Sequence, residues 1–111
     1  MTPLLVLTTV GTSFDARSLA AELVEQRLAA CVNIVPQIHS VYRWHGKVER
    51  DDEQLLIIKT AHERLDALQS ALFARHPYEV PEFVVLTIER LSSAYAEWLI
   101  GSLSPAPFSP L

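Results

Sequence analysis

Residues 32–60 read VNIVPQIHSVYRWHGKVERDDEQLLIIKT, and this stretch decides the fold. The first part, Val32–Trp44, has a side-chain pattern with a period of two, which predicts a long β-strand. Pro36 cannot donate a backbone hydrogen bond, so it marks an edge or a bulge within that strand. His45-Gly46 predicts a tight turn, and Lys47–Thr60 returns as a second strand. The stretch therefore predicts one long β-hairpin.

A two-residue loop also fixes which side chains face each other across the hairpin. The expected pairs are Trp44 with Lys47, Tyr42 with Glu49, Ser40 with Asp51, and His39 with Asp52. Trp44 and Lys47 would form a cation–π pair worth about 0.5–1 kcal/mol at an exposed site. His39 and Asp52 form the one polar pair suited to chemistry. The acidic run 49–53 is expected to be a solvated face, with weak, adventitious binding of divalent cations as the alternative.

The residues before the hairpin predict a strand and a helix. Leu4–Val10 is apolar and predicts a buried strand, and Gly11-Thr12-Ser13 predicts a turn, with a phosphate cradle as the less favoured alternative. Thr12-x-x-Asp15 loosely matches a capping box. Asp15–Ala30 has apolar residues at the spacing of one helical face and therefore predicts a helix.

The residues after the hairpin predict a helix, a strand and a further helix. Thr60-x-x-Glu63 matches a capping box and would open a helix. This helix should end near His76, because Pro77 disfavours helical geometry at the residue before it. Its core stripe is expected at Leu65, Leu68 and Leu72. A fourth strand is expected at Phe83–Ile88. The last helix is expected at Ser92–Gly101, with Leu91, Tyr95, Trp98 and Leu99 on one side.

The order βαββαβ plus a helix predicts an α+β fold, a ferredoxin-like sandwich with four strands and both main helices on one face. A length of 111 residues fits one domain. We expect this domain to span residues 1–103 and residues 104–111, rich in proline and serine, to form a flexible tail.

The predicted hairpin is too long for one compact domain of this size. Strands of about thirteen residues extend on the order of 43 Å, whereas the radius of gyration of such a domain is about 13 Å. The tip, with Tyr42, Trp44 and Val48, would be an exposed apolar patch unless another copy covers it. We therefore expect a homo-oligomer. The alternative is a hairpin that bends at Pro36 and folds back on its own sheet.

Composition excludes several classes of protein. The net charge is −4 and the nine basic residues are scattered, so no nucleic-acid partner is expected. The apolar runs are far shorter than the roughly 20 residues of a membrane-spanning helix, and no leader is recognisable, so no membrane partner is expected. A single cysteine excludes an intrachain disulfide and agrees with a reducing cytoplasm. The familiar catalytic motifs are absent, and no enzymatic activity is expected.

Two places could carry chemistry. Cys31 is either a small buried hydrophobic residue or a soft metal ligand or reactive thiol. It shares strand parity with His39, but eight residues of strand separate them by on the order of 26 Å, so they cannot bind one ion within one chain. His76-Pro77-Tyr78 with Pro81-Glu82 is either a rigid connection or a corner where His76, Tyr78 and Glu82 meet a cleft.

Four segments together resemble the divalent-cation-tolerance family CutA. They are Leu28-Ala29-Ala30-Cys31-Val32-Asn33, Ser40-Val41-Tyr42-Arg43-Trp44-His45-Gly46-Lys47-Val48, Ile58-Lys59-Thr60 and His76-Pro77-Tyr78-Glu79-Val80-Pro81-Glu82. The resemblance covers about residues 4–103. It implies a cytoplasmic homotrimer of ferredoxin-like subunits, in which the long hairpins form intersubunit sheets and the architecture is similar to that of the PII signalling proteins. It also implies a link to tolerance of copper and other divalent metals, with no established enzymatic reaction.

The resemblance carries over to particular residues of this chain. Cys31 matches the family cysteine that is proposed to lie near metal. The positions that match the family's motifs, and that look like walls of an intersubunit cleft, are Tyr42, Trp44, Lys47, Lys59, His76, Tyr78 and Glu82.

Two main hypotheses follow. In the first, Cu(II) or another divalent ion is held between subunits by a subset of Cys31, His39 and His76, with Glu82. In the second, a PII-like module binds a small anionic ligand through Lys47 and Lys59. An enzyme built on a His-Tyr-Glu constellation is a third, less favoured reading.

Overall fold

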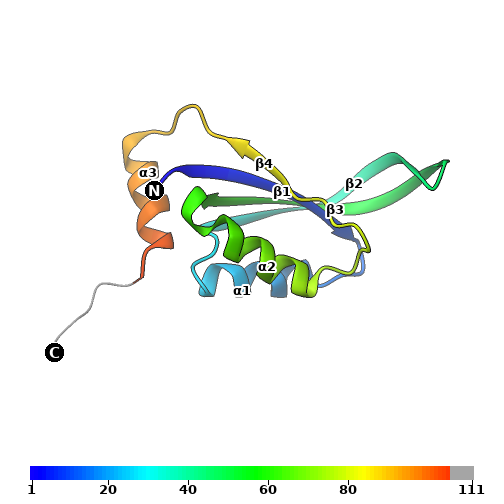
Figure 1. Ribbon diagram of the computed structural model, residues 1–111, viewed down its shortest axis with the longest axis horizontal. Coiled ribbons are helices and arrows are strands. Elements are labelled where there is room, and N and C mark those ends of the chain that lie inside the picture. Colours follow the sequence, from blue (N-terminus) through cyan, green and yellow to red (C-terminus); the bar gives the residue numbers. More distant parts are fainter. Residues whose placement is uncertain (106–111) are drawn as a thin grey trace.

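A computed structural model describes residues 1–105, and the long predicted hairpin is its most extended feature (Figure 1). Strand β2 spans Cys31–Trp44 and strand β3 spans Lys47–Ala61. All four predicted cross-strand pairs are confirmed. His45 and Gly46 have φ values of 48° and 78°, the left-handed conformations that a two-residue hairpin turn of type I′ requires. The register shifts between Val35 and Ile38, so the predicted bulge at Pro36 is confirmed.

The hairpin belongs to a four-stranded antiparallel sheet of order β2-β3-β1-β4. Strand β1, Pro3–Gly11, pairs with β3 on one side and with β4, Val84–Thr87, on the other. Strand β4 is shorter than the predicted strand Phe83–Ile88. The element order and this topology are those of the ferredoxin-like α+β fold, which confirms the predicted class.

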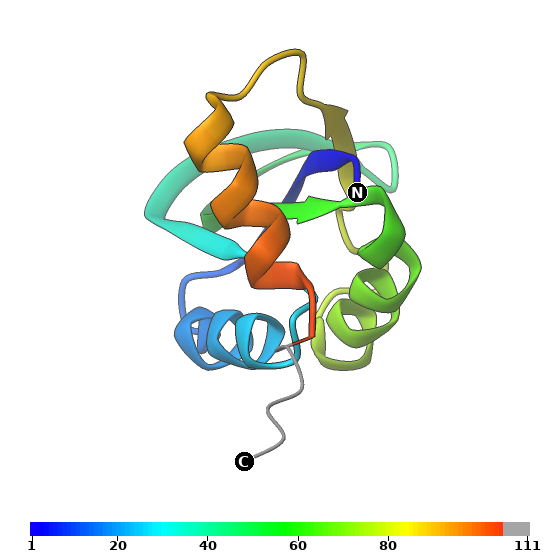
Figure 2. The ribbon, with the colours of Figure 1, turned by 90° about the vertical axis from the view of Figure 1, so that its left-hand side faces the viewer.

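Two helices, α1 (Ala16–Glu25) and α2 (Leu65–Arg75), cover one face of the sheet (Figures 1 and 2). Their inward leucines form the core with apolar side chains of β1 and β3. The buried members of this cluster include Val6, Val10, Leu19, Leu23, Leu56, Ile58, Leu68 and Leu72. Helix α2 ends at Arg75, directly before His76, as predicted from Pro77.

Helix α3, Ser93–Leu103, closes the end of the sheet near the N-terminus (Figure 2). Leu99 and Leu103 are buried against Ala30 and Ala61. The predicted inward position of Trp98 is wrong, since its side chain is 47% exposed.

Three predicted helix ends are also wrong. Helix α1 is capped by Asp15, which accepts from the backbone N–H of Ser18, and not by Thr12. It ends well before Ala30, because the backbone turns left-handed at Arg27 with φ 58°.

The predicted capping box at residues 60–63 does not form. The Thr60 hydroxyl donates to the carbonyl of Leu28 instead, and the Glu63 carboxylate accepts from the backbone N–H of Thr2. A 3₁₀ turn, η1 (His62–Arg64), therefore precedes α2.

The hairpin projects well beyond the helices (Figure 1). The principal extents are 58 × 30 × 23 Å and the radius of gyration is 15.5 Å, so the alternative of a folded-back hairpin is wrong. Tyr42 and Trp44 near its end are 40% and 37% exposed. Residues 106–111, most of the predicted tail, lie outside the described residues. Within residues 1–105, no helix has the length and apolar character needed to cross a membrane.

Candidate functional site

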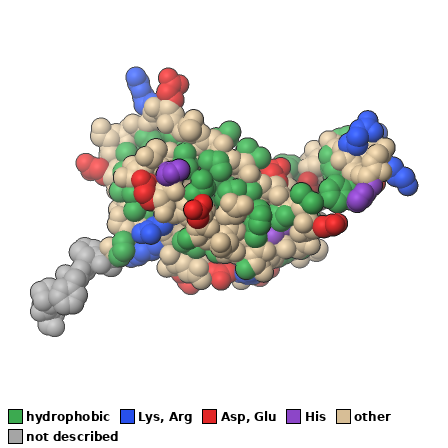
Figure 3. All heavy atoms as spheres, in the orientation of Figure 1, with side chains coloured by type: hydrophobic (Ala, Val, Ile, Leu, Met, Phe, Trp, Pro, Cys, Tyr) green, Lys and Arg blue, Asp and Glu red, His purple; other side chains and the backbone are tan. Residues whose placement is uncertain are grey.

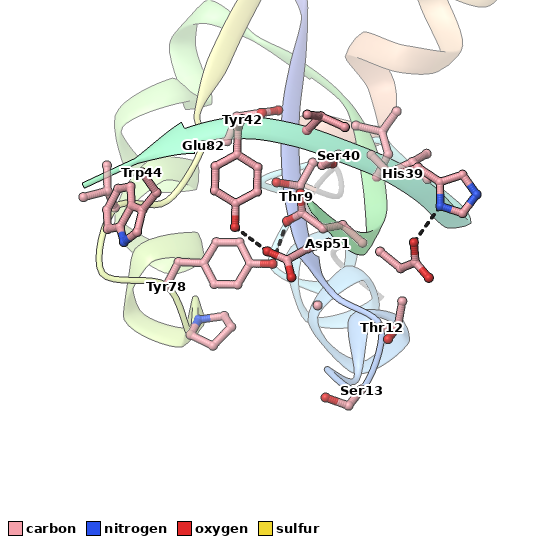
Figure 4. A pocket seen from close by; sticks show the side chains of 18 of the residues that line it. Thr9, Thr12, Ser13, His39, Ser40, Tyr42, Trp44, Asp51, Tyr78 and Glu82 are labelled. Carbon is pink, nitrogen blue, oxygen red and sulfur yellow. Dashed lines mark hydrogen bonds and ion pairs between the residues drawn. The ribbon is translucent and has the colours of Figure 1, made fainter. Parts of the chain in front are cut away.

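An open groove of about 1150 Å³ lies where the hairpin leaves the body of the molecule (Figure 4). Its walls come from β2, β3, the end of β1 and the loop that follows α2. Five carboxylates line it, and we call it the acidic groove: Asp51, Asp52, Glu53, Glu79 and Glu82. The aromatic side chains that line it are Tyr42, Trp44 and Tyr78. Among the described residues along its walls there is no lysine or arginine, so the groove is negatively charged.

His76 anchors the loop after α2 to strand β1. Its Nε2 lies 2.9 Å from the carbonyl oxygen of Thr9 and 3.4 Å from the hydroxyl of Thr8, and its Nδ1 accepts from the backbone N–H of Tyr78 at 3.1 Å. A carbonyl only accepts, so Nε2 carries a proton, and Nδ1 carries none because it accepts from Tyr78. The ring is therefore neutral. Burial lowers the pKa of His76, which favours the same neutral form. Both ring nitrogens are therefore occupied, and His76 offers no lone pair to a metal.

Tyr78 crosses the groove and donates its hydroxyl hydrogen to Glu53 Oε2 at 2.6 Å (Figure 4). Glu53 is only 7% exposed, so the predicted solvated face is wrong at this residue: it turns inward where the hairpin joins the body. Burial, followed by the bond to Glu53, raises the pKa of Tyr78.

The second phenol of the groove, Tyr42, donates to the carboxylate of Asp51. This hydrogen bond raises the pKa of Tyr42 to about 12. Burial, together with the negative charge of Glu53, raises the pKa of Glu82. The arrangement keeps both phenols protonated at neutral pH and does not activate them as bases or nucleophiles.

His39 lies at the edge of the groove, and its ring is held by Asp52. The His39 Nδ1 to Asp52 Oδ1 distance is 2.6 Å, and the other oxygen of Asp52 accepts from Gln37 at 3.1 Å. The His39 side chain is 79% exposed, which leaves Nε2 open to solvent. A carboxylate on one ring nitrogen with the other nitrogen free is the arrangement typical of a metal-binding histidine.

Cys31 lies at the opposite end of the hairpin from the turn. It pairs with Lys59 across the strands, and its partly exposed thiol makes only a 3.7 Å contact with the Asn33 side-chain oxygen. Lys59 lies over the ring of Tyr95, 5.5 Å from its centroid, and the hydrogen bond to Tyr95 raises the pKa of Lys59.

The predicted cleft is thus only partly assembled in one chain. Tyr42, Trp44 and Tyr78 line the groove, whereas Lys47 lies at the turn and Lys59 at the far end of the hairpin. The expected Trp44–Lys47 cation–π pair does not form, and Trp44 packs edge-on against His45 at 4.7 Å. A small anion would therefore find neither lysine in the groove of a single chain.

The predicted metal ligands Cys31, His39, His76 and Glu82 are also not brought together. Within residues 1–105, no three His, Cys, Asp or Glu side chains are placed to hold one metal ion. His39 keeps one ring nitrogen free and Cys31 is half-buried, whereas both ring nitrogens of His76 are in hydrogen bonds. Sequence reasoning missed the Glu53–Tyr78 pair, because residues 25 apart meet only through the loop after α2.

A family model described as the CutA1 divalent ion tolerance protein matches residues 4–102, and so covers every residue of this groove. The chain belongs to the CutA1 family. The resemblance of the four sequence segments is confirmed.

Curated CutA proteins are similar over most of this chain. The divalent-cation tolerance protein CutA of Thermus thermophilus is 49% identical over 94 residues, 85% of this chain and 91% of that protein. Protein CutA 1, chloroplastic, of rice is 48% identical over 99 residues, 89% of this chain and 56% of that protein. The chain thus spans about half the length of the plant relatives. The name of the Thermus protein describes divalent-cation tolerance, and neither name describes an enzyme.

Solved CutA structures share the fold over nearly the whole chain. CutA1 from rice superposes with a TM-score of 0.89 at 44% identity, covering 96% of this chain and 97% of that one. CutA from Synechococcus elongatus superposes with a TM-score of 0.87 at 50% identity, covering 93% of this chain and 91% of that one. One CutA structure, from Archaeoglobus fulgidus, is titled periplasmic and the plant proteins chloroplastic, so the cytoplasmic location of this chain stays a prediction.

Proposed function

We propose that this protein contributes to divalent-cation tolerance by binding copper or another divalent cation, and that it works as a cytoplasmic homotrimer. The observation that carries the proposal is the match of residues 4–102 to the CutA1 family model. That family is described by divalent ion tolerance, and a similar bacterial protein is named for divalent-cation tolerance.

His39 is the side chain best prepared to bind the metal. Asp52 holds its ring, and Nε2 is open to solvent. Imidazole is a ligand that copper and zinc both accept, and the acidic groove beside it favours cations over anions. Cys31 provides a thiol, a soft ligand for copper, but at a separate place along the hairpin.

A homotrimer would complete this ligand set. One imidazole does not make a specific metal site. Within residues 1–105, His39 is not part of any group of three or more His, Cys, Asp or Glu side chains that could hold a metal ion. The exposed aromatic end of the hairpin gives an independent reason for association, because a patch of this kind is costly in water. The anionic-ligand alternative has less support, since it needs lysines that the groove of one chain lacks.

The proposal is tested by calorimetric titration of Cu(II), and in parallel Zn(II), into the wild type and into the variants His39→Ala and Cys31→Ala. His62→Ala is the matched control, because His62 is exposed at the start of η1 and away from the groove. We expect His39→Ala to weaken binding by about tenfold or more, as loss of a metal ligand does, and His62→Ala to leave it unchanged.

Equal binding by wild type and His39→Ala would remove His39 as a ligand. Sedimentation of the wild type provides the assembly test, and a single-copy particle at all concentrations would contradict the trimer. Tolerance itself is measured by growth of a copper-sensitive bacterium that expresses the wild type or His39→Ala.

A further inference from the structure

The acidic groove carries negative charge that no lysine or arginine of the described residues balances. On the face shown in Figure 3, acidic and hydrophobic side chains meet where the hairpin leaves the body, whereas lysine and arginine side chains gather at the free end of the hairpin. Within residues 1–105, the one ion pair that involves the five carboxylates of the groove joins Asp52 to His39. The groove therefore favours a positively charged ligand.

Glu53 is the most enclosed of the five carboxylates, and only one of its oxygens has a donor. Its side chain lines the groove and is 7% exposed, and Oε2 accepts the hydroxyl hydrogen of Tyr78. Among residues 1–105, no group donates to Oε1, yet every fully enclosed side-chain oxygen or nitrogen has a hydrogen-bond partner. Oε1 therefore reaches the open space of the groove. A buried charge with a single neutral donor is costly, and a cationic donor that reaches Oε1 from the groove would stabilise it.

The walls of the groove place aromatic rings beside these carboxylates. Tyr42, Trp44 and Tyr78 line it, and Figure 4 shows both tyrosines pointing toward Asp51 with Trp44 beside them. The two phenols are held in place, because Tyr42 donates to Asp51 and Tyr78 donates to Glu53. Fixed aromatic faces attract a cation, and they also pack against the carbon chain of an organic ligand.

A bare metal ion fits this groove less well than an organic cation. Within residues 1–105, no three His, Cys, Asp or Glu side chains are placed to hold one metal ion. A primary ammonium group instead donates its three hydrogens to separate oxygens, and the attached carbon chain contacts the rings. Burial and the negative charge of Glu53 raise the pKa of Glu82, as expected where carboxylates lie near each other without a cation between them.

We propose that the acidic groove binds a small organic amine in its ammonium form. The ammonium group donates to Glu53 and Glu82, and the carbon chain lies against the rings of Tyr42 and Tyr78. The ligand is organic and the site does not use the His39 imidazole. The inference therefore goes beyond the proposed metal binding and is tested separately from it.

Four-carbon probes that differ only in charge test the proposal by calorimetric titration of the full chain. The probes are 1,4-diaminobutane, butane-1,4-diol and succinate, in a phosphate buffer freed of metal ions, because common amine buffers would compete for the site. We expect the diamine to bind and its uncharged and anionic analogues not to bind. Absence of diamine binding would overturn the proposal, and so would equal binding of the diol, which would show that apolar contact alone is enough.

A charge-removing variant locates the bound amine. Glu82→Gln keeps the size of the side chain but removes its charge, and it should weaken diamine binding by about tenfold or more. Glu25→Gln is the matched control, because Glu25 is exposed at the end of α1 and outside the groove. We expect this control to bind like the wild type. Equal binding by the two variants would show that the amine responds to the net charge of the protein, or binds elsewhere, and would overturn the proposal.

A second pair of variants tests the aromatic wall. Tyr42→Phe keeps the ring and should retain diamine binding, whereas Tyr42→Leu removes the ring and should weaken binding by about threefold. Circular dichroism and sedimentation show whether each variant folds and assembles like the wild type, and the Glu82→Gln result stands whether or not Tyr42→Leu folds. A folded Tyr42→Leu protein that binds the diamine as Tyr42→Phe does would contradict the aromatic contact. No metal is present in these titrations, so their failure would leave the proposed metal binding standing.

Discussion

The carboxylate of Glu53 depends on one phenol for its hydrogen bond. Glu53 is 7% exposed and accepts from Tyr78 at 2.6 Å. Tyr78→Phe removes the donor and leaves a buried charged acceptor unpaired. We expect a loss of about 1 kcal/mol in the free energy of unfolding, at the low end for such a group because water reaches Tyr78. Urea unfolding at fixed protein concentration measures it.

Tyr42→Phe is the matched control, because Tyr42 donates to Asp51, which is exposed. Water replaces the lost donor there, so the effect should be smaller than that of Tyr78→Phe. Equal losses of unfolding free energy in the two variants would contradict the argument that the burial of Glu53 makes its hydrogen bond more important for stability. Adding Glu53→Gln to Tyr78→Phe should recover part of the loss, since a neutral amide is cheaper to leave unpaired.

The neutral ring of His76 predicts a pH dependence. Protonation would place a new N–H at Nδ1, against the backbone N–H of Tyr78. The folded-state pKa of His76 lies below the ordinary value of about 6.5, so the unfolded chain binds the proton more readily. The contribution of His76 to stability is therefore complete above about pH 6.5 and declines as the pH falls through the folded-state pKa.

Unfolding of the wild type and of His76→Gln, measured at several pH values from 8 to 5, isolates this contribution. We expect the wild type to lose more stability than the variant over this range. The comparison is needed because the raised pKa of Glu82 acts in the opposite direction: its folded form binds protons more readily, so it adds stability as the pH falls. Parallel curves would contradict the assigned tautomer.

At the scale of the element, the hairpin turn needs a glycine because of its left-handed backbone conformation, and not because a side chain would lack room there. Gly46 has φ 78°, and a Cβ built there meets no atom within 4 Å. Gly46→Ala should therefore destabilise the protein by about 1 kcal/mol through backbone strain alone. Gly101 in α3 also has open space around its Cβ position but a helical backbone, so Gly101→Ala should stabilise by about 0.5–1 kcal/mol. Thermal unfolding of both variants should give shifts of opposite sign.

The same scale explains which elements the sequence could predict. The hairpin follows from local rules: a period of two, a proline that forces a bulge and a two-residue turn that fixes the register. The capping box at residues 60–63 was predicted from a local rule as well, but it does not form. Both of its side chains make hydrogen bonds with residues that are distant in the sequence instead. Local patterns therefore predict elements well wherever no distant residue competes for the same hydrogen-bonding groups.

The candidate site was less predictable, because it is assembled from three separated segments. The His39–Asp52 pair followed from hairpin register alone. The inward position of Glu53 did not, since it lies within an acidic run and meets a tyrosine 25 residues away. That contact depends on how the loop after α2 returns to β1, which His76 fixes through Thr9. The pattern at residues 76–82 indicated a corner at a cleft, and Tyr78 and Glu82 do line the groove, but it did not indicate that Glu53 would be the partner of Tyr78.

At the scale of the whole molecule, the projecting hairpin predicts where association is sensitive to loss of apolar surface. Val48 in the tip and Val24 on α1 are 49% and 40% exposed, so they offer similar area at two different places. Val48→Ser should weaken association, because apolar area buried between copies contributes roughly 25 cal/mol per Å². Val24→Ser should leave it unchanged, since the outer face of α1 lies away from the projecting hairpin.

Trp44→Ser extends this test to the largest side chain of the tip. A tryptophan at the centre of an interface contributes more than an aliphatic side chain, so sedimentation should show a greater loss of association than Val48→Ser produces. Trp44 is 37% exposed and makes its aromatic contact with His45 in the same turn, so its removal should leave the leucine core of α1 and α2 intact. A Trp44→Ser protein that is folded by circular dichroism yet associates like the wild type would show that the hairpin projects for a reason other than contact between copies.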